Sequence, residues 1–421
     1  MIRLVRVFLG VGFAGVAVAL STRQGLLLVV ALGMWAAALM ALLWHRWALA
    51  GIRVATRFDP ERVFPGESAR LTIAVENRSL LPVPWLMIQI RMPQQLRPLK
   101  GTVRVEPSQR ALLLEQHFTL AHRQRVTRRI DVTGVSRGAH RLGEVLLFSS
   151  DPLHLGDVTG QVSTGGELLV YPRTVPIRDA ALTSLRPFGV QEVRGRLFSD
   201  PEKVVGVRPY RPEDPPRQIH WKATARQPEE IMVKETDPSV QPALLLLVDP
   251  VEYRQGQEFL AESTVDLAAE AAASLARWAF ERRWSLGLGV RGLTAGSGRQ
   301  VRVPMGRQRD QLRRVLTALA AMVPAGFFID RGRWLAAETR RIGHGTRVVL
   351  VVGRADRAAG GWMTGLERRG FPAQILTVSA DGSEAGVRAT PWARLAGLGD
   401  AGAGEPGGPA PGTLRDAWAR S

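Results

Sequence analysis

Two short, unbroken apolar runs in the C-terminal half of the chain constrain its fold most strongly. Residues 243–248 and 348–352 contain only aliphatic side chains. Runs of this length suit strands that are buried on both faces, as in a parallel sheet covered by helices. Residues 258–283 and 308–322, which lie between the runs, have apolar side chains at helical spacing. This alternation predicts a doubly wound, mostly parallel α/β sheet over residues 243–396.

The middle of the chain, residues 51–175, has the pattern of an antiparallel β domain. Residues 70–77 alternate between polar and apolar side chains, as a half-buried strand does. Residues 86–91 form another apolar, strand-like stretch, with prolines on both sides. Short strands with turn signals and no helical period predict an immunoglobulin-like β-sandwich.

Two apolar runs at the N-terminus predict a transmembrane helical hairpin over residues 1–50. The runs cover residues 4–20 and 26–44, and each is close to the roughly 20 residues that a membrane span needs. A polar turn at residues 21–25 joins them. More arginines flank the open end of the hairpin than its turn, and the positive-inside rule then places the rest of the chain in the cytoplasm. The expectation is an inner-membrane protein with two spans; a buried hairpin in a soluble core is the alternative.

Charge and composition limit the possible partners. The formal charge is +18, from 56 Lys and Arg against 38 Asp and Glu, and the chain has no cysteine. Disulfides, thiolate metal sites and cysteine nucleophiles are therefore excluded. The positive charge suits membrane lipid or an acidic partner, although a solvated basic surface explains it equally well. Residues 97–141 of the sandwich are rich in arginine but poor in aromatics. We interpret these arginines first as polar, outward positions of strands and second as a face for anionic lipid or polymer. No nucleic-acid partner is predicted, since such surfaces interleave aromatic with basic residues.

A stretch rich in arginine, proline and aromatic residues, residues 207–226, carries the candidate site. Its arginines offer planar, bidentate donors, and its tryptophan offers a large apolar anchor. We interpret the stretch first as an ion-paired structural clamp and second as a partner-binding or catalytic site. The candidate residues are Arg208, Tyr210, Asp214, Arg217, His220, Trp221, Lys222 and Arg226.

This stretch resembles the signature of the bacterial family called domain of unknown function 58, or DUF58. The resemblance rests on Gly206, Ile219, Thr224 and Ala225 together with the eight candidate residues. Arg137-Gly138, Asp151-Pro152 and Tyr171-Pro172 resemble the upstream part of the family pattern, whereas Glu213 replaces the usual glycine. The resemblance implies a membrane-anchored protein with a von Willebrand factor A-like C-terminal domain. It also implies a MoxR-type AAA+ ATPase and a transglutaminase-like membrane protein as partners.

The same resemblance raises the question of a metal site. Von Willebrand factor A domains hold Mg²⁺ through Asp-x-Ser-x-Ser after the first strand, but here Asp249 is followed by Pro-Val-Glu-Tyr. Only Asp249, Glu252 and Asp356 remain as candidate ligands, too few oxygens for Mg²⁺. We therefore predict no metal and no cofactor. The sequence also lacks a P-loop and the His-Glu-x-x-His and Gly-x-Ser-x-Gly motifs of common hydrolases.

The sequence predicts five segments. They are a helical hairpin (1–50), a β-sandwich (51–175), a linker with the signature (176–242), an α/β domain (243–396) and a disordered tail (397–421). The predicted function is a non-enzymatic, membrane-anchored protein-interaction module that works in assembly, chaperoning or stress response. Two alternatives stay open: a hydrolytic enzyme that uses Asp249 and Asp356 with His220, and a binder of anionic lipid or polymer.

Overall fold

The fold is seen in a computed structural model of the 421-residue chain. The structure describes residues 2–396 apart from 107–110, 151–156, 178–203, 212–213, 215, 227–229, 237–241, 255–256, 260, 296–297, 325–329, 341, 344, 380–382 and 384–386. The chain divides into two compact units, and the main boundary lies between Arg173 and Thr174. The predicted tail and the Asp151-Pro152 motif lie outside the described residues, and the predicted domain limits stay predictions.

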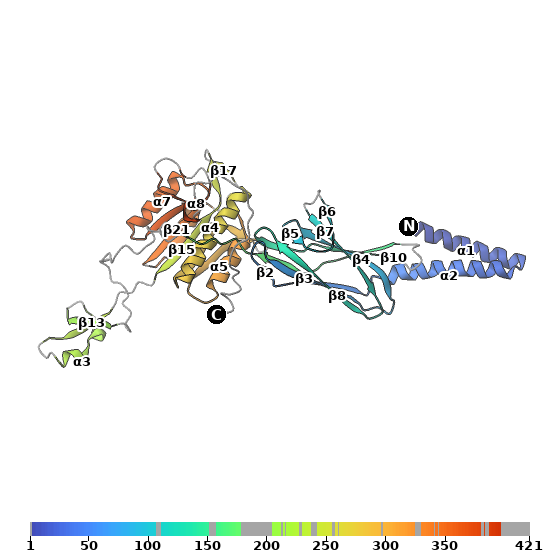
Figure 1. Ribbon diagram of the computed structural model, residues 1–421, viewed down its shortest axis with the longest axis horizontal. Coiled ribbons are helices and arrows are strands. Elements are labelled where there is room, and N and C mark those ends of the chain that lie inside the picture. Colours follow the sequence, from blue (N-terminus) through green and yellow to red (C-terminus); the bar gives the residue numbers. More distant parts are fainter. Residues whose placement is uncertain are drawn as a thin grey trace. The chain divides into compact units, whose positions relative to one another are not determined.

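Two N-terminal helices pack against each other as a hairpin (Figure 1). Helix α1 spans Ile2–Thr22 and helix α2 spans Gly25–Trp47. Arg23, with φ 52°, makes the left-handed turn between them. The helices approach closely at small residues, since a Cβ atom on Gly15 would lie 3.1 Å from the Cβ of Ala31.

The predicted membrane spans are wrong. Among the described residues, no helix combines the length and the apolar character that a membrane crossing requires. The predicted inner-membrane location with two spans is overturned by the same finding. The apolar pattern did predict the two helices themselves.

The β-rich region consists of mainly antiparallel sheets around one core, and only β2 and β12, among the described strands of this region, pair in parallel. One sheet has the order β1-β3-β8-β5, a second has the order β11-β10-β4-β7-β6, and a small third has the order β2-β12-β9. The bounds of their strands are β1 Ile52–Asp59, β2 Arg62–Val63, β3 Ser68–Asn77, β4 Val83–Pro93, β5 Leu96–Pro98, β6 Thr102–Glu106, β7 Ala111–Leu120, β8 Arg125–Gly134, β9 Gly138–Arg141, β10 Val145–Ser150, β11 Asp157–Val162 and β12 Glu167–Val170.

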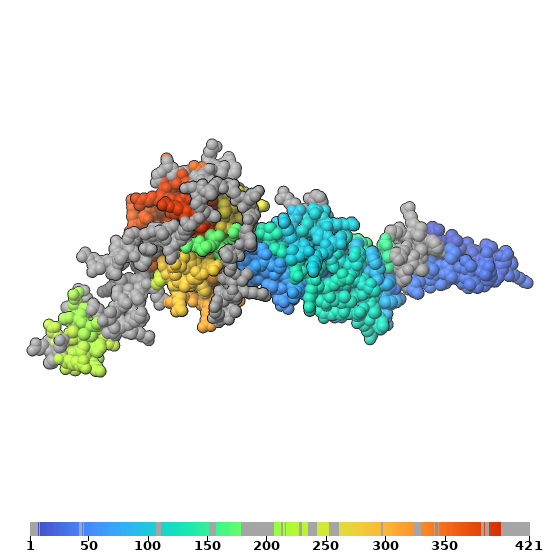
Figure 2. Space-filling view, in the orientation of Figure 1, coloured from blue at the N-terminus to red at the C-terminus, as the bar shows by residue number. Residues whose placement is uncertain are grey.

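Alternation of side chains explains why this region forms a sandwich. Along β3, Leu71 and Ile73 are fully buried, and along β4 Ile88 and Ile90 are fully buried, whereas their neighbours are more exposed. The buried sets from both sheets belong to one hydrophobic cluster. Period-two burial toward a shared core is the pattern that the sequence predicted. Figure 2 shows the outer surface of these strands, in blue to green.

The C-terminal unit is built on a mixed sheet with the order β19-β18-β15-β21-β22-β23, with β20 also paired to β18. Strands β18, β15, β21, β22 and β23 are parallel, whereas β19 and β20 run antiparallel to β18. The strand bounds are β15 Ala243–Asp249, β18 Ser285–Thr294, β19 Gln300–Gly306, β20 Met322–Pro324, β21 Thr346–Val352, β22 Ala373–Thr377 and β23 Thr390–Pro391. The likeness to a von Willebrand factor A domain stays a prediction.

Helices cover this sheet (Figure 1). Their bounds are α4 Glu262–Glu281, α5 Gln311–Ala320, α6 Arg331–Thr339, α7 Arg357–Arg368 and α8 Trp392–Ala396. Leu247 of β15 and Leu350 of β21 share a buried cluster with Trp334 of α6 and Met363 of α7. Neighbouring strand residues such as Leu246 point to the opposite face by alternation and are also fully buried. This double burial explains the unbroken apolar runs.

One predicted helix begins later than expected. Residues 257–259 form strand β17 (Gln257–Phe259), which pairs with β16 (Glu252–Arg254), and the helix starts only at Glu262. Leu267 of that helix is 39% exposed, although its residue type is apolar. The inward stripe of α4 consists mainly of alanines, which let the helix lie close to the sheet.

We expect Leu350→Ala to lower the free energy of unfolding of the C-terminal unit by about 2–5 kcal/mol, because the change leaves a cavity in a fully packed layer. Urea denaturation followed by tryptophan fluorescence measures the loss. The matched control is Leu267→Ala, which removes the same atoms from an exposed position and should cost under about 1 kcal/mol. Equal losses in both variants would contradict this description of the core.

Candidate functional site

The signature residues form a small module of their own. Strand β13 (Val204–Pro209) pairs antiparallel with β14 (Met232–Thr236), and Arg208 lies opposite Val233. A 3-10 turn, η3 (Pro216–Gln218), and the short helix α3 (Trp221–Thr224) connect the two strands. The backbone N–H of Tyr210 extends the pairing by donating to the carbonyl of Ile231 at 2.7 Å. The described part of this module is yellow-green in Figures 1 and 2.

A bidentate ion pair fixes the turn after β13. The guanidinium of Arg208 donates to both oxygens of Asp214, with Nη1–Oδ2 at 2.7 Å and Nη2–Oδ1 at 2.6 Å. Asp214 also accepts the backbone N–H of Arg211 at 2.9 Å. Arg208 is the main reason that the pKa of Asp214 falls to about 2. Paired, charge-assisted hydrogen bonds of this kind fix orientation as well as distance, and both residues therefore serve the structure of the turn. The side chain of Glu213 lies outside the described residues.

His220 also has a structural task. Its ring Nδ1 accepts the backbone N–H of Ala223 at 3.0 Å and caps helix α3. Its backbone N–H donates to the carbonyl of Met232 at 2.8 Å, and the hydroxyl of Thr224 accepts from the backbone N–H of Met232 at 3.0 Å. Because Nδ1 accepts this hydrogen bond, Nε2 is the ring nitrogen that can donate. These contacts join α3 to β14.

The remaining candidates face outward. Trp221 is 71% exposed, and Tyr210 and Ile231 are also exposed. Arg217, Lys222 and Arg226 are exposed cations of the same module. Trp221 is therefore not the buried anchor that a structural clamp would need. The described signature residues therefore form two sets. The internal set holds the backbone in place and consists of Arg208, Asp214 and His220. The external set is exposed to solvent and consists of Tyr210, Arg217, Trp221, Lys222, Arg226 and Ile231.

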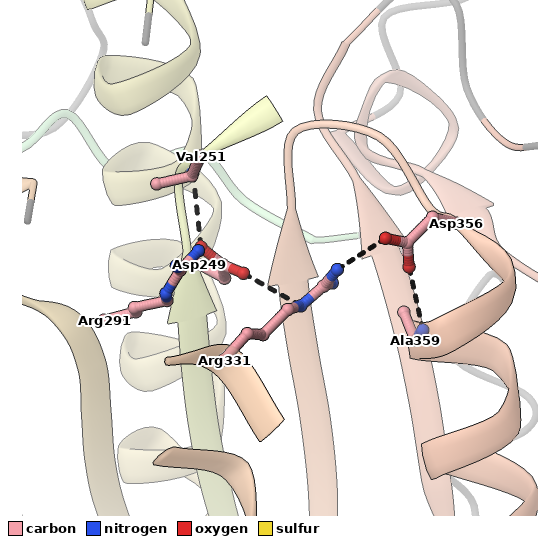
Figure 3. Close-up of polar contacts among 6 residues, drawn as sticks. All are labelled: Asp249, Val251, Arg291, Arg331, Asp356 and Ala359. Atoms are coloured by element: carbon pink, nitrogen blue, oxygen red, sulfur yellow. Dashed lines mark hydrogen bonds and ion pairs between the residues drawn. The ribbon is translucent and has the colours of Figure 1, made fainter. Parts of the chain in front are cut away.

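A second cluster of charges lies at the carboxyl edge of the large sheet (Figure 3). Asp249 ends β15 and is fully buried, and Arg291 on the adjacent strand β18 is 2% exposed. Nη1 of Arg291 lies 3.4 Å from Oδ1 of Asp249, and Nε of Arg331 lies 3.0 Å from Oδ2. Nη1 of Arg331 lies 2.7 Å from Oδ2 of Asp356, which caps helix α7 through the backbone N–H of Ala359 at 2.8 Å. Arg331 thus bridges the two acidic candidates.

The electrostatics of Asp249 show two opposing effects. Burial raises the pKa of this carboxyl, while Arg331 and Arg291 act in the opposite direction. Although Oδ2 is 3.0 Å from Nε of Arg331, it accepts no hydrogen bond within the described part of the chain, so the contact is an ion pair without hydrogen-bond alignment. An unpaired buried carboxylate would be costly, and two adjacent guanidinium groups offset that cost.

The residues do not fit a Mg²⁺ site. Mg²⁺ needs near-octahedral oxygen ligation, yet Asp249 and Asp356 are both engaged with Arg331. Within the ranges that the structure describes, no three acidic or histidine side chains are grouped as metal ligands. The side chain of Glu252 lies outside those ranges.

The sequence pointed to Asp249 and Asp356 as candidate ligands but gave neither arginine as a candidate. Arg291 interrupts an otherwise apolar strand, and a charged residue in such a strand needs a buried counter-ion; that signal was available. Arg331 follows Asp330, whose side chain caps α6 by accepting the backbone N–H of Arg333 at 2.8 Å. Nothing in the spacing of Arg331 reveals that its side chain reaches two distant acids.

Several arginines of the sandwich have partners within it. Arg104 lies 3.1 Å from Glu115, Arg141 lies 2.9 Å from Glu167, and Arg128 stacks over the ring of Phe118 at 4.9 Å. Arg125 and Arg129 are exposed. Binding of anionic lipid or polymer by this region stays a prediction.

The fold and the two clusters define a β-sandwich chain with a mixed α/β domain and an Arg- and Trp-rich module. Residues 206–384 match the family model described as "Protein of unknown function DUF58". This match supports the DUF58 family, as the signature indicated. No curated protein matches the chain.

Several solved structures resemble part of the chain. A CARDB domain from Pyrococcus furiosus, crystallised with di-metal ions, is 13% identical, with 27% of this chain and 91% of that one covered and a TM-score of 0.17. A non-cellulosomal cohesin from Archaeoglobus fulgidus is 13% identical, with 29% and 91% covered and a TM-score of 0.20. A type II cohesin dyad from Acetivibrio cellulolyticus is 7% identical, with 30% and 51% covered and a TM-score of 0.21. Similarity at these TM-scores does not establish a common function.

We expect the carboxyl of Asp214 to titrate near pH 2, because ionised Asp214 is held by Arg208. A carboxyl-carbon NMR titration measures the midpoint. The stability that this pair contributes, on the order of 1 kcal/mol for a pair near the surface, is complete above pH about 4 and is lost as the pH falls through about 2. Arg208→Ala should move the midpoint toward 4. A midpoint near 4 in the unmodified protein would contradict the bidentate geometry.

Proposed function

We propose that the chain is a non-enzymatic protein-interaction module that docks its partner through the external set of the signature: Tyr210, Arg217, Trp221, Lys222, Arg226 and Ile231. The observation that carries this proposal is the exposure of Trp221, at 71%, on a module whose backbone is fixed by internal contacts. Tryptophan and arginine are the residues most enriched among interface hot spots. A rigid backbone lowers the entropic cost of binding, because the contact residues are ordered beforehand.

The charge of this surface selects the kind of partner. Among the described residues, Arg217, Lys222 and Arg226 form no ion pair with an acidic side chain, and the whole chain has a formal charge of +18. An acidic protein surface with an apolar recess for Trp221 would complement both features. Steering by opposite charge also makes association sensitive to ionic strength.

The partner that we propose is a MoxR-type AAA+ ATPase, with a transglutaminase-like protein as a further component. The resemblance to DUF58 proteins motivates this choice, and the basic, aromatic surface supports an acidic partner face. The cellular role would then be assembly, chaperoning or a stress response, with this chain as the adaptor.

The hydrolytic alternative has less support. His220 uses Nδ1 to cap α3, and no hydrogen bond or ion pair joins it to Asp249 or Asp356 in the described structure. Both acids are engaged by Arg331. A general base must lie within hydrogen-bond reach of the proton that it removes, and acids held by a guanidinium are poorly placed for that task.

We expect Trp221→Ala to weaken binding to the cognate ATPase about 30-fold, the effect of losing a hot-spot side chain worth about 2 kcal/mol. Isothermal titration calorimetry with the purified ATPase, with and without ATP, measures the change. The matched control is Trp85→Ala, since Trp85 is 40% exposed but belongs to the sandwich. Unchanged affinity in the Trp221 variant, or an equal loss in the control, would rule out the proposed surface.

A charge-reversal variant tests the acidic character of the partner. Lys222→Glu should reduce the association rate several-fold at low salt, and the difference from the unmodified protein should shrink as salt rises, because screening removes steering. Surface plasmon resonance at several salt concentrations measures both rates. A variant that associates faster than the unmodified protein would mean that the partner face is basic.

A further inference from the structure

We infer that Arg331 is a built-in cation at the carboxyl edge of the large sheet, and that it takes the position between Asp249 and Asp356 that a divalent metal ion would need. The α/β unit is then complete without metal. This inference is independent of the docking surface proposed above, because it concerns other residues.

The geometry of Arg331 supports this role. Its Nε lies 3.0 Å from Asp249 at the end of β15, and its Nη1 lies 2.7 Å from Asp356 at the start of α7 (Figure 3). A guanidinium presents several donors in one plane, so a single side chain can serve two carboxylates. A metal ion that bridges two acids would have to replace these contacts.

The charge balance leads to the same conclusion. Among the described ion pairs at this edge, two cations, Arg291 and Arg331, face two anions, Asp249 and Asp356, where Asp249 is fully buried and the side chain of Arg331 is 11% exposed. Adding a divalent ion to this neutral group would leave two uncompensated charges in a low-dielectric region, which is strongly unfavourable. Metal binding therefore requires Arg331 to leave.

The position of Arg331 in the chain keeps it in place. It is the first residue of α6, and the adjacent Asp330 caps that helix. Trp334 and Leu335, on the next turn, are buried in the core below the site. This packing holds α6 in place. The guanidinium of Arg331 is therefore always present at the site, whereas a metal ion would have to bind from solution.

The first test is thermal unfolding of the full chain in EDTA and in about 10 mM MgCl₂ or MnCl₂, a concentration that would stabilise a protein with an ordinary divalent site by several degrees. The expected result is the same midpoint in all three solutions. The inference would be overturned if the metal salts raised the unfolding midpoint by several degrees and Asp249→Asn abolished that rise, because this would place a metal ion on the carboxylate.

The second test removes the built-in cation with Arg331→Met, which keeps the length of the side chain. We expect lower stability than in the unmodified protein. The loss should grow as the pH rises above about 4, because Asp249 ionises there in the unfolded chain, while burial without Arg331 keeps the pKa of the folded carboxyl raised. The control is Arg333→Met on the same helix, where the arginine is exposed. Equal stability of the two variants across the pH range would overturn the inference.

Two further variants keep the test informative if Arg331→Met does not fold. Arg331→Lys retains the charge, but its single ammonium cannot serve two carboxylates in the same planar way, and its stability should lie below that of the unmodified protein. The double change of Asp249→Asn with Arg331→Met leaves one cation, Arg291, and one anion, Asp356, of the four residues. This double variant should be more stable than Arg331→Met alone. A double variant that is less stable than both single variants would contradict the pairing.

Discussion

The compensation of one buried carboxylate is the constraint on which the C-terminal unit depends. Asp249 ends the central strand and is fully buried, and a charge in that position needs a counter-charge close by. Arg291 supplies one from the neighbouring strand, and Arg331 supplies another from α6 while also holding Asp356. Strands β15 and β18 and helices α6 and α7 therefore meet around one ionic group, above the apolar layer formed by Leu247, Leu350 and their neighbours.

The signature module follows the same physical logic on a smaller scale. Arg208 and Asp214 neutralise each other and fix a turn, and His220 caps α3 and bonds to β14. Because these polar groups are used internally, the surface of the module is left to Trp221 and to Arg217, Lys222 and Arg226, which form no ion pair with the acids that the structure describes. A site of this kind is suited to recognition, since its shape is set before a partner arrives.

Much of the fold could be predicted from sequence because buried positions in strands and helices give regular patterns of apolar residues. The runs that contain Leu246 and Leu350 are apolar throughout because both faces of their strands are covered, and the alternation around Leu71 marks a sandwich strand. Length and apolar character alone did not establish a membrane hairpin at the N-terminus. They indicated two helices, but no helix among the described residues has both the length and the apolar character of a span.

The sites were harder to predict because side-chain contacts between distant segments produce no pattern of residues in the sequence. Asp249 and Asp356 were named from their residue type as candidate ligands, but the partner that joins them, Arg331, lies on a helix whose register the sequence does not fix. Trp221 was expected from its residue type to be a large apolar anchor, yet only the position of α3 determines which way it faces. At Asp249 and at Trp221, the residue type indicated which interactions are possible, and the fold determines which of them form.

The most direct test of this account is a crystal structure of the protein soaked in MnCl₂, with anomalous scattering measured at the manganese edge. The account predicts no anomalous peak beside Asp249 or Asp356, and a guanidinium of Arg331 in contact with both carboxylates. A peak about 2.1 Å from either carboxylate, a metal–oxygen bonding distance, with Arg331 displaced, would contradict the claim that the fold provides its own cation.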